Sequence, residues 1–200
     1  MRPAIEKRCQ KSTRCGVRQG LEATEKMINL CKGLMSAAAL CVAMSGAALA
    51  QVSDNRVSAS TDWSVFVDGN PQQCWSVSAP KETVNTKNGK PATVRRGDIL
   101  LFVTYGPDGK GIVSFSGGYP FAPDSTVDLD VSGTKFELYV DGEWAWAGTE
   151  GDDAKIVAAM KAGSSAVLVA RSAKGTQTQD TFSLSGFSAA VDEAAKRCGG

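Results

Sequence analysis

Apolar and polar residues alternate in short stretches from Gln51 to the end of the chain. Alternation over four to eight residues predicts a strand with one buried face, and clusters of Gly, Pro, Asn and Asp between the stretches predict turns. Strands are therefore expected at 63–67, 73–78, 112–115, 127–131, 135–140, 144–147, 165–172 and 176–184. This pattern predicts a mainly β protein.

Two stretches depart from the alternation. Residues 99–103, ILLFV, are continuously apolar, as in a strand that is covered on both faces. Residues 81–96 are polar around Asn88-Gly89 and are expected to form a long loop or an irregular hairpin.

Two helices are predicted in addition to the strands. Thr149 and Asp152 resemble a capping box, although Asp stands where Glu or Gln is usual, and Gly163 is placed to end this helix. In the C-terminal stretch, about 100° per residue puts one apolar stripe on Phe187, Val191, Ala194, Ala195 and Cys198. The expected fold is an antiparallel β-sandwich with one short internal helix and a C-terminal helix packed on the sheet, in a single domain over residues 51–200.

The first fifty residues have a different character. They hold eight Lys or Arg against three Asp or Glu, all at or before Lys32. Residues 33–50 carry no charge. A membrane anchor is disfavoured because this apolar stretch is short and rich in alanine, whereas a spanning helix needs about 20 apolar residues.

The uncharged stretch is instead typical of a signal peptide, which we expect at residues 27–50. The small residues at its end predict cleavage between Ala50 and Gln51. Residues 1–26 are then a long n-region or a misassigned start before Met27. The expected location is the periplasm or the outer cell envelope, with no transmembrane segment after cleavage.

Export would leave two of the six cysteines, Cys74 and Cys198, in the mature chain. Two cysteines in an exported protein favour a disulfide, which would tie the C-terminal helix to an early strand. A buried free thiol at Cys198 is the simpler alternative. A redox-active pair is disfavoured because the chain has no histidine and the two cysteines do not form a C-x-x-C motif.

The composition excludes several kinds of chemistry. The absence of histidine rules out Ser-His-Asp and Cys-His catalysis and His-ligated zinc. Residues 51–200 hold fourteen Lys or Arg against eighteen Asp or Glu, so no basic surface for nucleic acid is expected. The acid pairs Asp128/Asp130 and Asp152/Asp153 have the composition of a glycosidase or calcium site. A solvated strand face and helix N-terminal charges explain them better, and we expect no catalytic site, metal or cofactor.

The stretch FELYVDGEWAWAG predicts a hairpin with an aromatic face. A turn at Asp141-Gly142 would pair Val140 with Glu143 and Tyr139 with Trp144. Tyr139, Trp144 and Trp146 then share one face, which suits sugar stacking or a protein partner. The alternative is that a second sheet or the helix at 149–161 covers the tryptophans.

The chain also resembles the invasion-associated locus B family. The resemblance lies in Trp63-Ser64-Val65, SFSGGYPF, DDAKIVAAMKAG and DTFSLSGFSAAVDEAAKRC, in this order. It implies an exported, single-domain, strand-rich protein of the Gram-negative envelope, from a family without an established catalytic site and with some members linked to host-cell invasion. Many members carry a cysteine shortly after the first Trp, whereas this chain has none there.

The expected function is therefore non-enzymatic. We expect an envelope protein that binds a protein or glycan partner and contributes to host-cell invasion or envelope integrity. The alternative is a hydrolase that acts on envelope polysaccharide through paired carboxylates. A third possibility is an envelope-stress or permeability factor without a discrete ligand.

Overall fold

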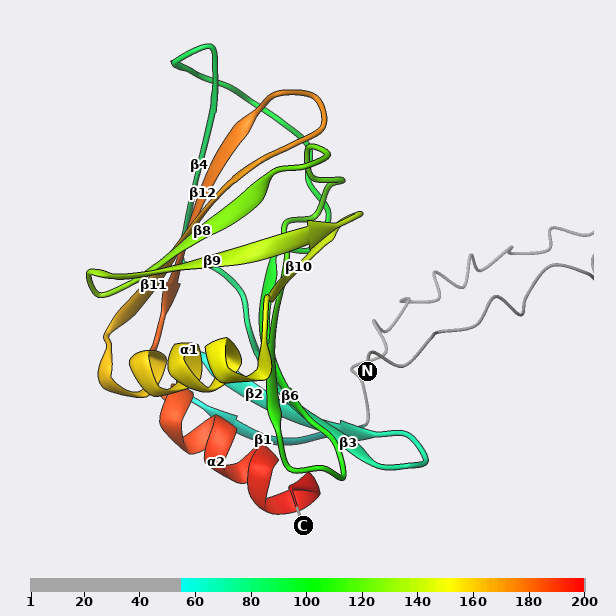
Figure 1. Ribbon diagram of the computed structural model, residues 1–200. Coiled ribbons are helices and arrows are strands. Elements are labelled where there is room, and N and C mark those ends of the chain that lie inside the picture. Colours follow the sequence, from blue (N-terminus) through cyan, green and yellow to red (C-terminus); the bar gives the residue numbers. More distant parts are fainter. Residues whose placement is uncertain (1–54, 200) are drawn as a thin grey trace, which may run out of the picture. The chain divides into compact units, whose positions relative to one another are not determined.

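The computed structural model describes residues 55–199, which contain twelve strands and two helices (Figure 1). The expected signal peptide, its cleavage site between Ala50 and Gln51, and the extension at 1–26 lie outside the described residues. The elements, in chain order, are β1 (Arg56–Ser60), β2 (Trp63–Asp68), β3 (Gln73–Ser78), β4 (Glu82–Lys87), β5 (Lys90–Pro91), β6 (Leu100–Tyr105), β7 (Gly111–Ser116), β8 (Thr126–Val131), β9 (Thr134–Asp141), β10 (Trp144–Ala147), α1 (Glu150–Ala162), β11 (Ser165–Arg171), β12 (Gln177–Ser183) and α2 (Phe187–Cys198).

All twelve strands belong to one open antiparallel sheet, in the order β1-β2-β3-β6-β7-β10-β9-β8-β11-β12-β4-β5. The sheet folds over on itself. Its first half, made of β1, β2, β3, β6 and β7, faces the half that contains β8, β11 and β12 (Figure 1). Contacts join the two halves: the rings of Phe115 and Phe182 meet edge to face at 6.2 Å, and Trp63 Nε1 donates to the Ser183 carbonyl at 2.9 Å. The predicted mainly β, sandwich-like fold with two helices is confirmed.

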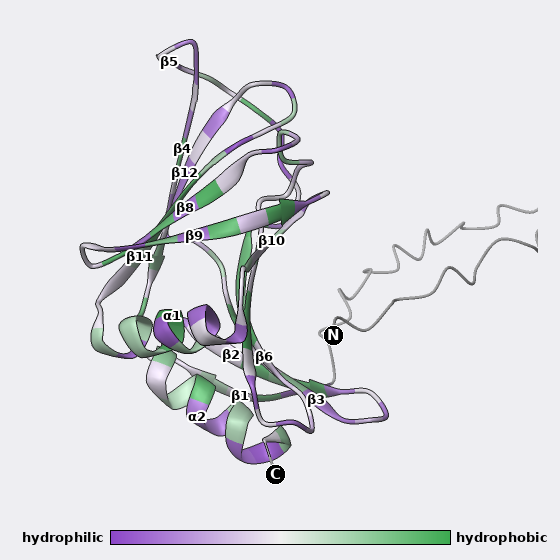
Figure 2. Ribbon diagram, in the orientation of Figure 1, coloured by the Kyte–Doolittle hydropathy of each residue, from purple (hydrophilic) through white to green (hydrophobic). Residues whose placement is uncertain are grey.

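The core lies between these two halves. Alternate residues of most strands are buried in it, and several strands carry both hydrophobic and hydrophilic residues along their length (Figure 2). Its largest fully buried side chains include Trp63, Phe115, Phe182, Phe187, Leu101, Leu129 and Leu138. The expectation that 99–103 is covered on both faces is wrong. Leu101 and Val103 are fully buried, whereas Phe102 is only partly buried because it lies on the outside of the sheet.

The polar segment 81–96 contributes a strand as well as a hairpin. β4 pairs with β12 along five residue pairs, and β5 folds back on β4 around Asn88-Gly89. β4 and β1, which the alternation did not predict, are composed of exposed and half-buried residues. Such strands at or near a sheet edge bury neither face completely and therefore leave little hydrophobic pattern.

Local signals set the bounds of the helices. At the start of α1, Thr149 Oγ1 accepts from the Asp152 amide at 3.2 Å, and Gly163 ends the helix. α2 buries its apolar stripe against β2 and β3. Gly186 precedes α2 with φ of 87°, and a Cβ there would overlap the carbonyl oxygen of Ser60. In the described part of the chain, neither helix has the length and apolar character to cross a membrane.

Cys74 and Cys198 form a disulfide that joins β3 to the last turn of α2, with their Cα atoms 5.7 Å apart. Both residues are buried, as the position of Cys198 on the apolar stripe predicted. This confirms the expected pairing and excludes the free-thiol alternative. The bond fixes the C-terminal helix to the first half of the sheet.

A buried ion pair adds a second link across the fold. The Arg96 guanidinium contacts the Asp180 carboxylate through two hydrogen bonds of 2.8 and 2.6 Å. Arg96 also donates to the Gly117 carbonyl, and Thr83 donates to Asp180. The segment after β5 is thereby joined to both β12 and the end of β7. The side chains of the pair are 6% and 0% exposed, so water does not screen the charges.

Candidate functional site

The hairpin of β9 and β10 has a different register from the predicted one. Trp144 lies opposite Asp141, and Trp146 lies opposite Tyr139, so the loop consists of Gly142 and Glu143. Gly142 has φ of 62°, and Glu143 is not among the residues with positive φ. This conformation matches a turn whose first central position requires glycine. The predicted pairings of Val140 with Glu143 and of Tyr139 with Trp144 are wrong, but the faces are unchanged.

Tyr139, Trp144 and Trp146 share the outer face of the sheet, away from the core. Tyr139 is 55% exposed and Trp144 is 39% exposed, while Trp146 is half-buried. On the opposite face, Leu138 and Ala145 are fully buried. Neither the second half of the sheet nor α1 therefore covers Tyr139 and Trp144.

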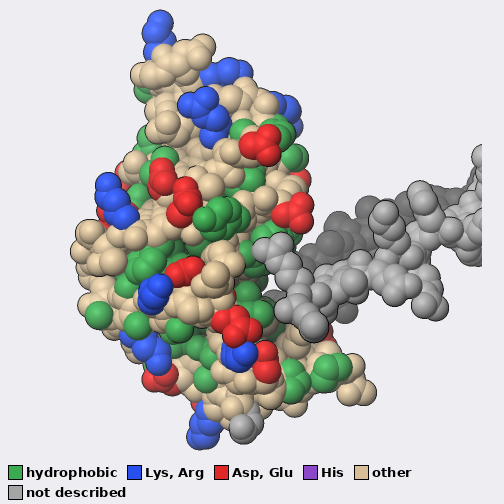
Figure 3. All heavy atoms as spheres, in the orientation of Figure 1, with side chains coloured by type: hydrophobic (Ala, Val, Ile, Leu, Met, Phe, Trp, Pro, Cys, Tyr) green, Lys and Arg blue, Asp and Glu red, His purple; other side chains and the backbone are tan. Residues whose placement is uncertain are grey.

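Further aromatic residues extend this face across the first half of the sheet. The ring of Trp144 lies 5.6 Å from that of Phe102 and 6.2 Å from that of Trp146. Farther along, Phe66 and Trp75 stack at 5.8 Å. We call this set the outer aromatic surface; its members are Phe66, Trp75, Phe102, Tyr139, Trp144 and Trp146. In the space-filling view, hydrophobic side chains reach the surface among charged ones (Figure 3).

Sequence reasoning missed Phe66, Trp75 and Phe102. The signal was present in the alternation of β2 and β3, which places Phe66 and Trp75 opposite their buried neighbours. Pairing between strands brings these side chains together with those of β10. The order of the strands in the sheet cannot be derived from the residue pattern within one strand.

The first pair of acids has a structural explanation. Asp128 and Asp130 lie on the outer face of β8, opposite Glu137 and Lys135 of β9. Asp130 accepts a hydrogen bond of 2.7 Å from the Gly133 amide, which closes the turn between the two strands. In residues 55–199, no group of three or more His, Cys, Asp or Glu side chains is arranged to hold a metal ion.

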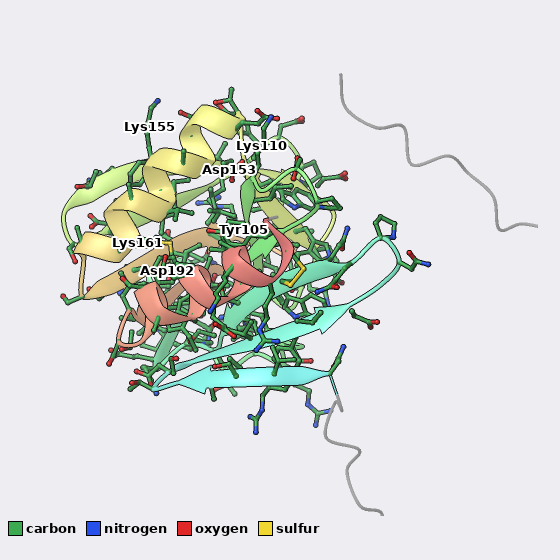
Figure 4. All side chains as sticks on the ribbon, turned by 90° about the horizontal axis from the view of Figure 1, so that it is seen from below. Tyr105, Lys110, Asp153, Lys155, Lys161 and Asp192 are labelled. Carbon is green, nitrogen blue, oxygen red and sulfur yellow. A yellow bond between two sulfur atoms is a disulfide. The ribbon has the colours of Figure 1, made fainter. Side chains whose placement is uncertain are left out.

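Of the second pair of acids, Asp153 lines a cleft between α1 and the β6–β7 turn, and Asp152 does not (Figure 4). The two carboxylates have different partners. Asp152 accepts from Thr149 at 2.7 Å and from Lys155 at 2.9 Å, and these bonds hold its pKa below the ordinary value. Asp153 is buried and accepts from the Val113 amide at 2.8 Å. The two acids therefore do not face a common point, as a glycosidase pair does.

Asp153 completes the hydrogen bonding of the sheet where a strand is missing. β10 pairs with β7 only as far as Trp146 opposite Ser114, and the next amide along β7 is that of Val113. Asp153 supplies the acceptor from the first turn of α1. Burial raises the pKa of Asp153, and the hydrogen bond from Val113 opposes this effect.

Tyr105 lies at the floor of the same cleft. It is 7% exposed, and its ring packs on Gly111, where a Cβ would come within 3.0 Å of the ring. Burial raises the pKa of Tyr105, and the negative charge of Asp192 raises it further. Ion pairs lie nearby: Lys110 with Glu150 at 2.8 Å, and Lys161 with Asp192 at 2.6 Å.

Comparison with known proteins places the chain in a family. The family described as "Invasion associated locus B (IalB) protein" matches residues 63–195. No curated protein sequence matches significantly. Among solved structures, the chain is similar to the crystal structure of invasion associated protein B from Bartonella henselae, with 17% identity, a TM-score of 0.47, and coverage of 68% of this chain and 94% of that one. Because the family match covers more than half of this chain, the chain belongs to the invasion associated locus B family.

Proposed function

We propose that the protein is a non-enzymatic binding protein of the cell envelope and that the outer aromatic surface contacts its partner. Three observations support the envelope location: the signal-peptide pattern of residues 27–50, the Cys74–Cys198 disulfide and the family membership. The observation that carries the binding role is that Tyr139 and Trp144 are exposed on the outside of the sheet and that half-buried aromatic rings lie on the same face.

The size of this surface favours a protein over a glycan as the partner. It extends from Phe66 on β2 to Tyr139 on β9 and crosses six adjacent strands. At about 4.8 Å between strands, this is about 24 Å. One sugar ring stacks on a single aromatic side chain, whereas aromatic residues with a charged rim are typical of protein interfaces. Glu137 and Asp141 lie at the edge of the surface and supply such a rim.

The word "invasion" in the family name makes contact with a host cell one setting in which the partner is met. An envelope protein of the same bacterium is the other. Both settings require an exported protein with an accessible binding face, so the same surface serves either. The crosslinking experiment described next identifies the partner.

The test is site-specific photo-crosslinking in intact cells followed by mass spectrometry. A photoreactive residue replaces Tyr139 in one variant and Ala189, on the exposed side of α2, in the control. We expect one protein to be captured from position 139 and not from position 189. Capture of the same proteins at both positions, or of none, would contradict the proposal.

A paired substitution checks that the aromatic side chains cause the binding. Trp144→Ser should abolish the crosslink from position 139, whereas Val84→Ser, an exposed apolar residue on β4, should leave it unchanged. If envelope polysaccharide changes the tryptophan fluorescence and no protein is captured, the partner is a glycan and the protein assignment is wrong.

A further inference from the structure

We propose that the cleft between α1 and the β6–β7 turn binds a small organic cation, an ammonium compound with an apolar body. This site is separate from the outer aromatic surface, and the proposal does not rest on the function proposed above. The cleft has a volume of about 610 Å³ and lies between one side of α1 and residues 108–112. This volume is within the range of small-molecule binding sites.

The walls of the cleft are apolar. Ile112 is 46% exposed on one side, although its strand is otherwise largely buried. On the other side α1 presents Ala154, Val157 and Ala158. The two alanines are exposed, so their short side chains leave the cleft open. An apolar ligand body would contact both walls and would bury Ile112.

Two polar groups at the floor of the cleft have hydrogen-bonding capacity left over. Tyr105 and Asp153 are each 7% exposed. In the part of the chain that the structure describes, the Tyr105 hydroxyl has no hydrogen-bond partner, and Asp153 uses only Oδ1, toward Val113. Among residues 55–199, no side-chain oxygen or nitrogen is both shielded from solvent and without a hydrogen-bond partner. The Tyr105 hydroxyl therefore opens into the cleft, and burial in a protein favours a partner for such groups.

The charges around the cleft select the sign of the ligand. Lys110 is paired with Glu150, and Lys161 with Asp192. Lys155, on the same helix, points away from the cleft (Figure 4). Asp153 has no ion-pair partner among the described residues. The charge that remains uncompensated at the floor is negative, so an ammonium group would be attracted and a carboxylate repelled.

The geometry thus assigns a role to each part. The ammonium group donates to Asp153 and to the Tyr105 oxygen, and the apolar body lies between Ile112 and Val157. Gly111 suits this position because a Cβ there would come within 3.0 Å of the Tyr105 ring, which would have to shift by a few tenths of an ångström.

The test uses phenethylammonium as the probe and backbone amide NMR on the full-length protein. Phenethyl alcohol and 3-phenylpropanoate are matched neutral and anionic controls. We expect saturable shifts at residues 109–113 and 151–158 with the ammonium compound, with a Kd of about 1 mM for a ligand of this size. We expect at least about tenfold weaker binding of the two controls, because a hydrogen bond between charged groups is lost.

Variants separate the contributions of charge and shape. Asp153→Asn keeps an acceptor for Val113 but loses the charge, and should weaken binding about tenfold; Tyr105→Phe should weaken it severalfold. Ala158→Leu fills the cleft without altering a polar group and should abolish the shifts. Ala189→Leu, at an exposed alanine of α2, is the matched control and should bind normally.

Absence of saturable shifts in the cleft would overturn the proposal, as would equal binding of the alcohol and the ammonium compound. Equal loss of binding in Ala158→Leu and Ala189→Leu would also overturn it. A dispersed amide spectrum shows that each variant is folded. If Asp153→Asn unfolds, the Ala158→Leu result and the comparison of the three probes still decide the question.

Discussion

Removal of the Cys74–Cys198 disulfide is expected to cause a large loss of stability. The bond joins residues separated by 124 positions and therefore restricts most of the described chain in the unfolded state. The perturbation is the double variant Cys74→Ala/Cys198→Ala. Alanine removes the bond without placing a new polar group at Cys74, which is fully buried.

The magnitude follows from the length of the closed loop. In the chain-entropy description, a loop of this length contributes about 5 kcal/mol at 25 °C. Domains typically unfold with about 5–15 kcal/mol, so the loss is a large fraction of the total. α2 still has Phe187, Val191 and Ala194 buried against the sheet. We therefore expect the last turn of α2 to separate from β3 first, and its amides to exchange faster with solvent.

The assay is equilibrium unfolding in urea under non-reducing conditions, followed by tryptophan fluorescence, because Trp63 lies in the core. A reducing agent should lower the stability of the native protein toward that of the double variant and leave the variant itself unaffected. If the free energies of unfolding of the native protein and the variant differ by less than about 1 kcal/mol with equal slopes, the loop-closure reasoning is wrong.

Three further predictions concern buried groups and backbone geometry. Asp180→Asn leaves the buried Arg96 charge without its carboxylate and should lower the free energy of unfolding by about 3 kcal/mol in urea titrations; a loss below about 1 kcal/mol would mean that the pair is solvated. Gly186→Ala should lower the free energy of unfolding by about 2 kcal/mol or more in the same assay, because the new Cβ would overlap the backbone of β1. The control is Gly133→Ala, where φ is 96° but the surrounding space is open, and the expected loss is about 1 kcal/mol. Equal losses in the two variants would refute the steric argument. Burial raises the pKa of Asp153 in the folded protein. The stability gained when Asp153 is protonated is therefore fully present below the unfolded-state pKa and is lost as the pH rises through the raised folded-state pKa. Asp153→Asn should remove this part of the pH dependence of stability, and an unchanged pH dependence in the variant would contradict the prediction.

Much of the fold was predictable because its strands obey a local rule. A strand that buries one face must alternate, and β8, β9, β11 and β12 do so. The helices were equally predictable from Thr149, Gly163 and the spacing of the stripe that ends in Cys198. The arrangement of all strands in a single folded sheet depends on pairings between distant segments. Residue periodicity does not report such pairings, and β1 and β4 have little periodicity to read.

The candidate sites were predictable only in part, for the same reason. Tyr139, Trp144 and Trp146 lie on neighbouring strands of one hairpin, so alternation together with the predicted turn assigned them to one face. Phe102 joins them through the order of strands in the sheet. In the cleft, Tyr105 and Asp153 come from a strand and a helix that meet only in the folded chain.

The pairing of β4 with β12 bears on the order in which the chain can fold. Thr83 on β4 donates a hydrogen bond to Asp180, 97 positions later in the chain. Cys74 forms its disulfide with Cys198, 124 positions later. During synthesis from the N-terminus, both segments are complete long before the residues that satisfy them. Before β12 and α2 are synthesised, β4 has no strand to pair with along its length and Cys74 has no cysteine with which to form its disulfide. Folding of the whole sheet is therefore delayed until the C-terminal segment is available.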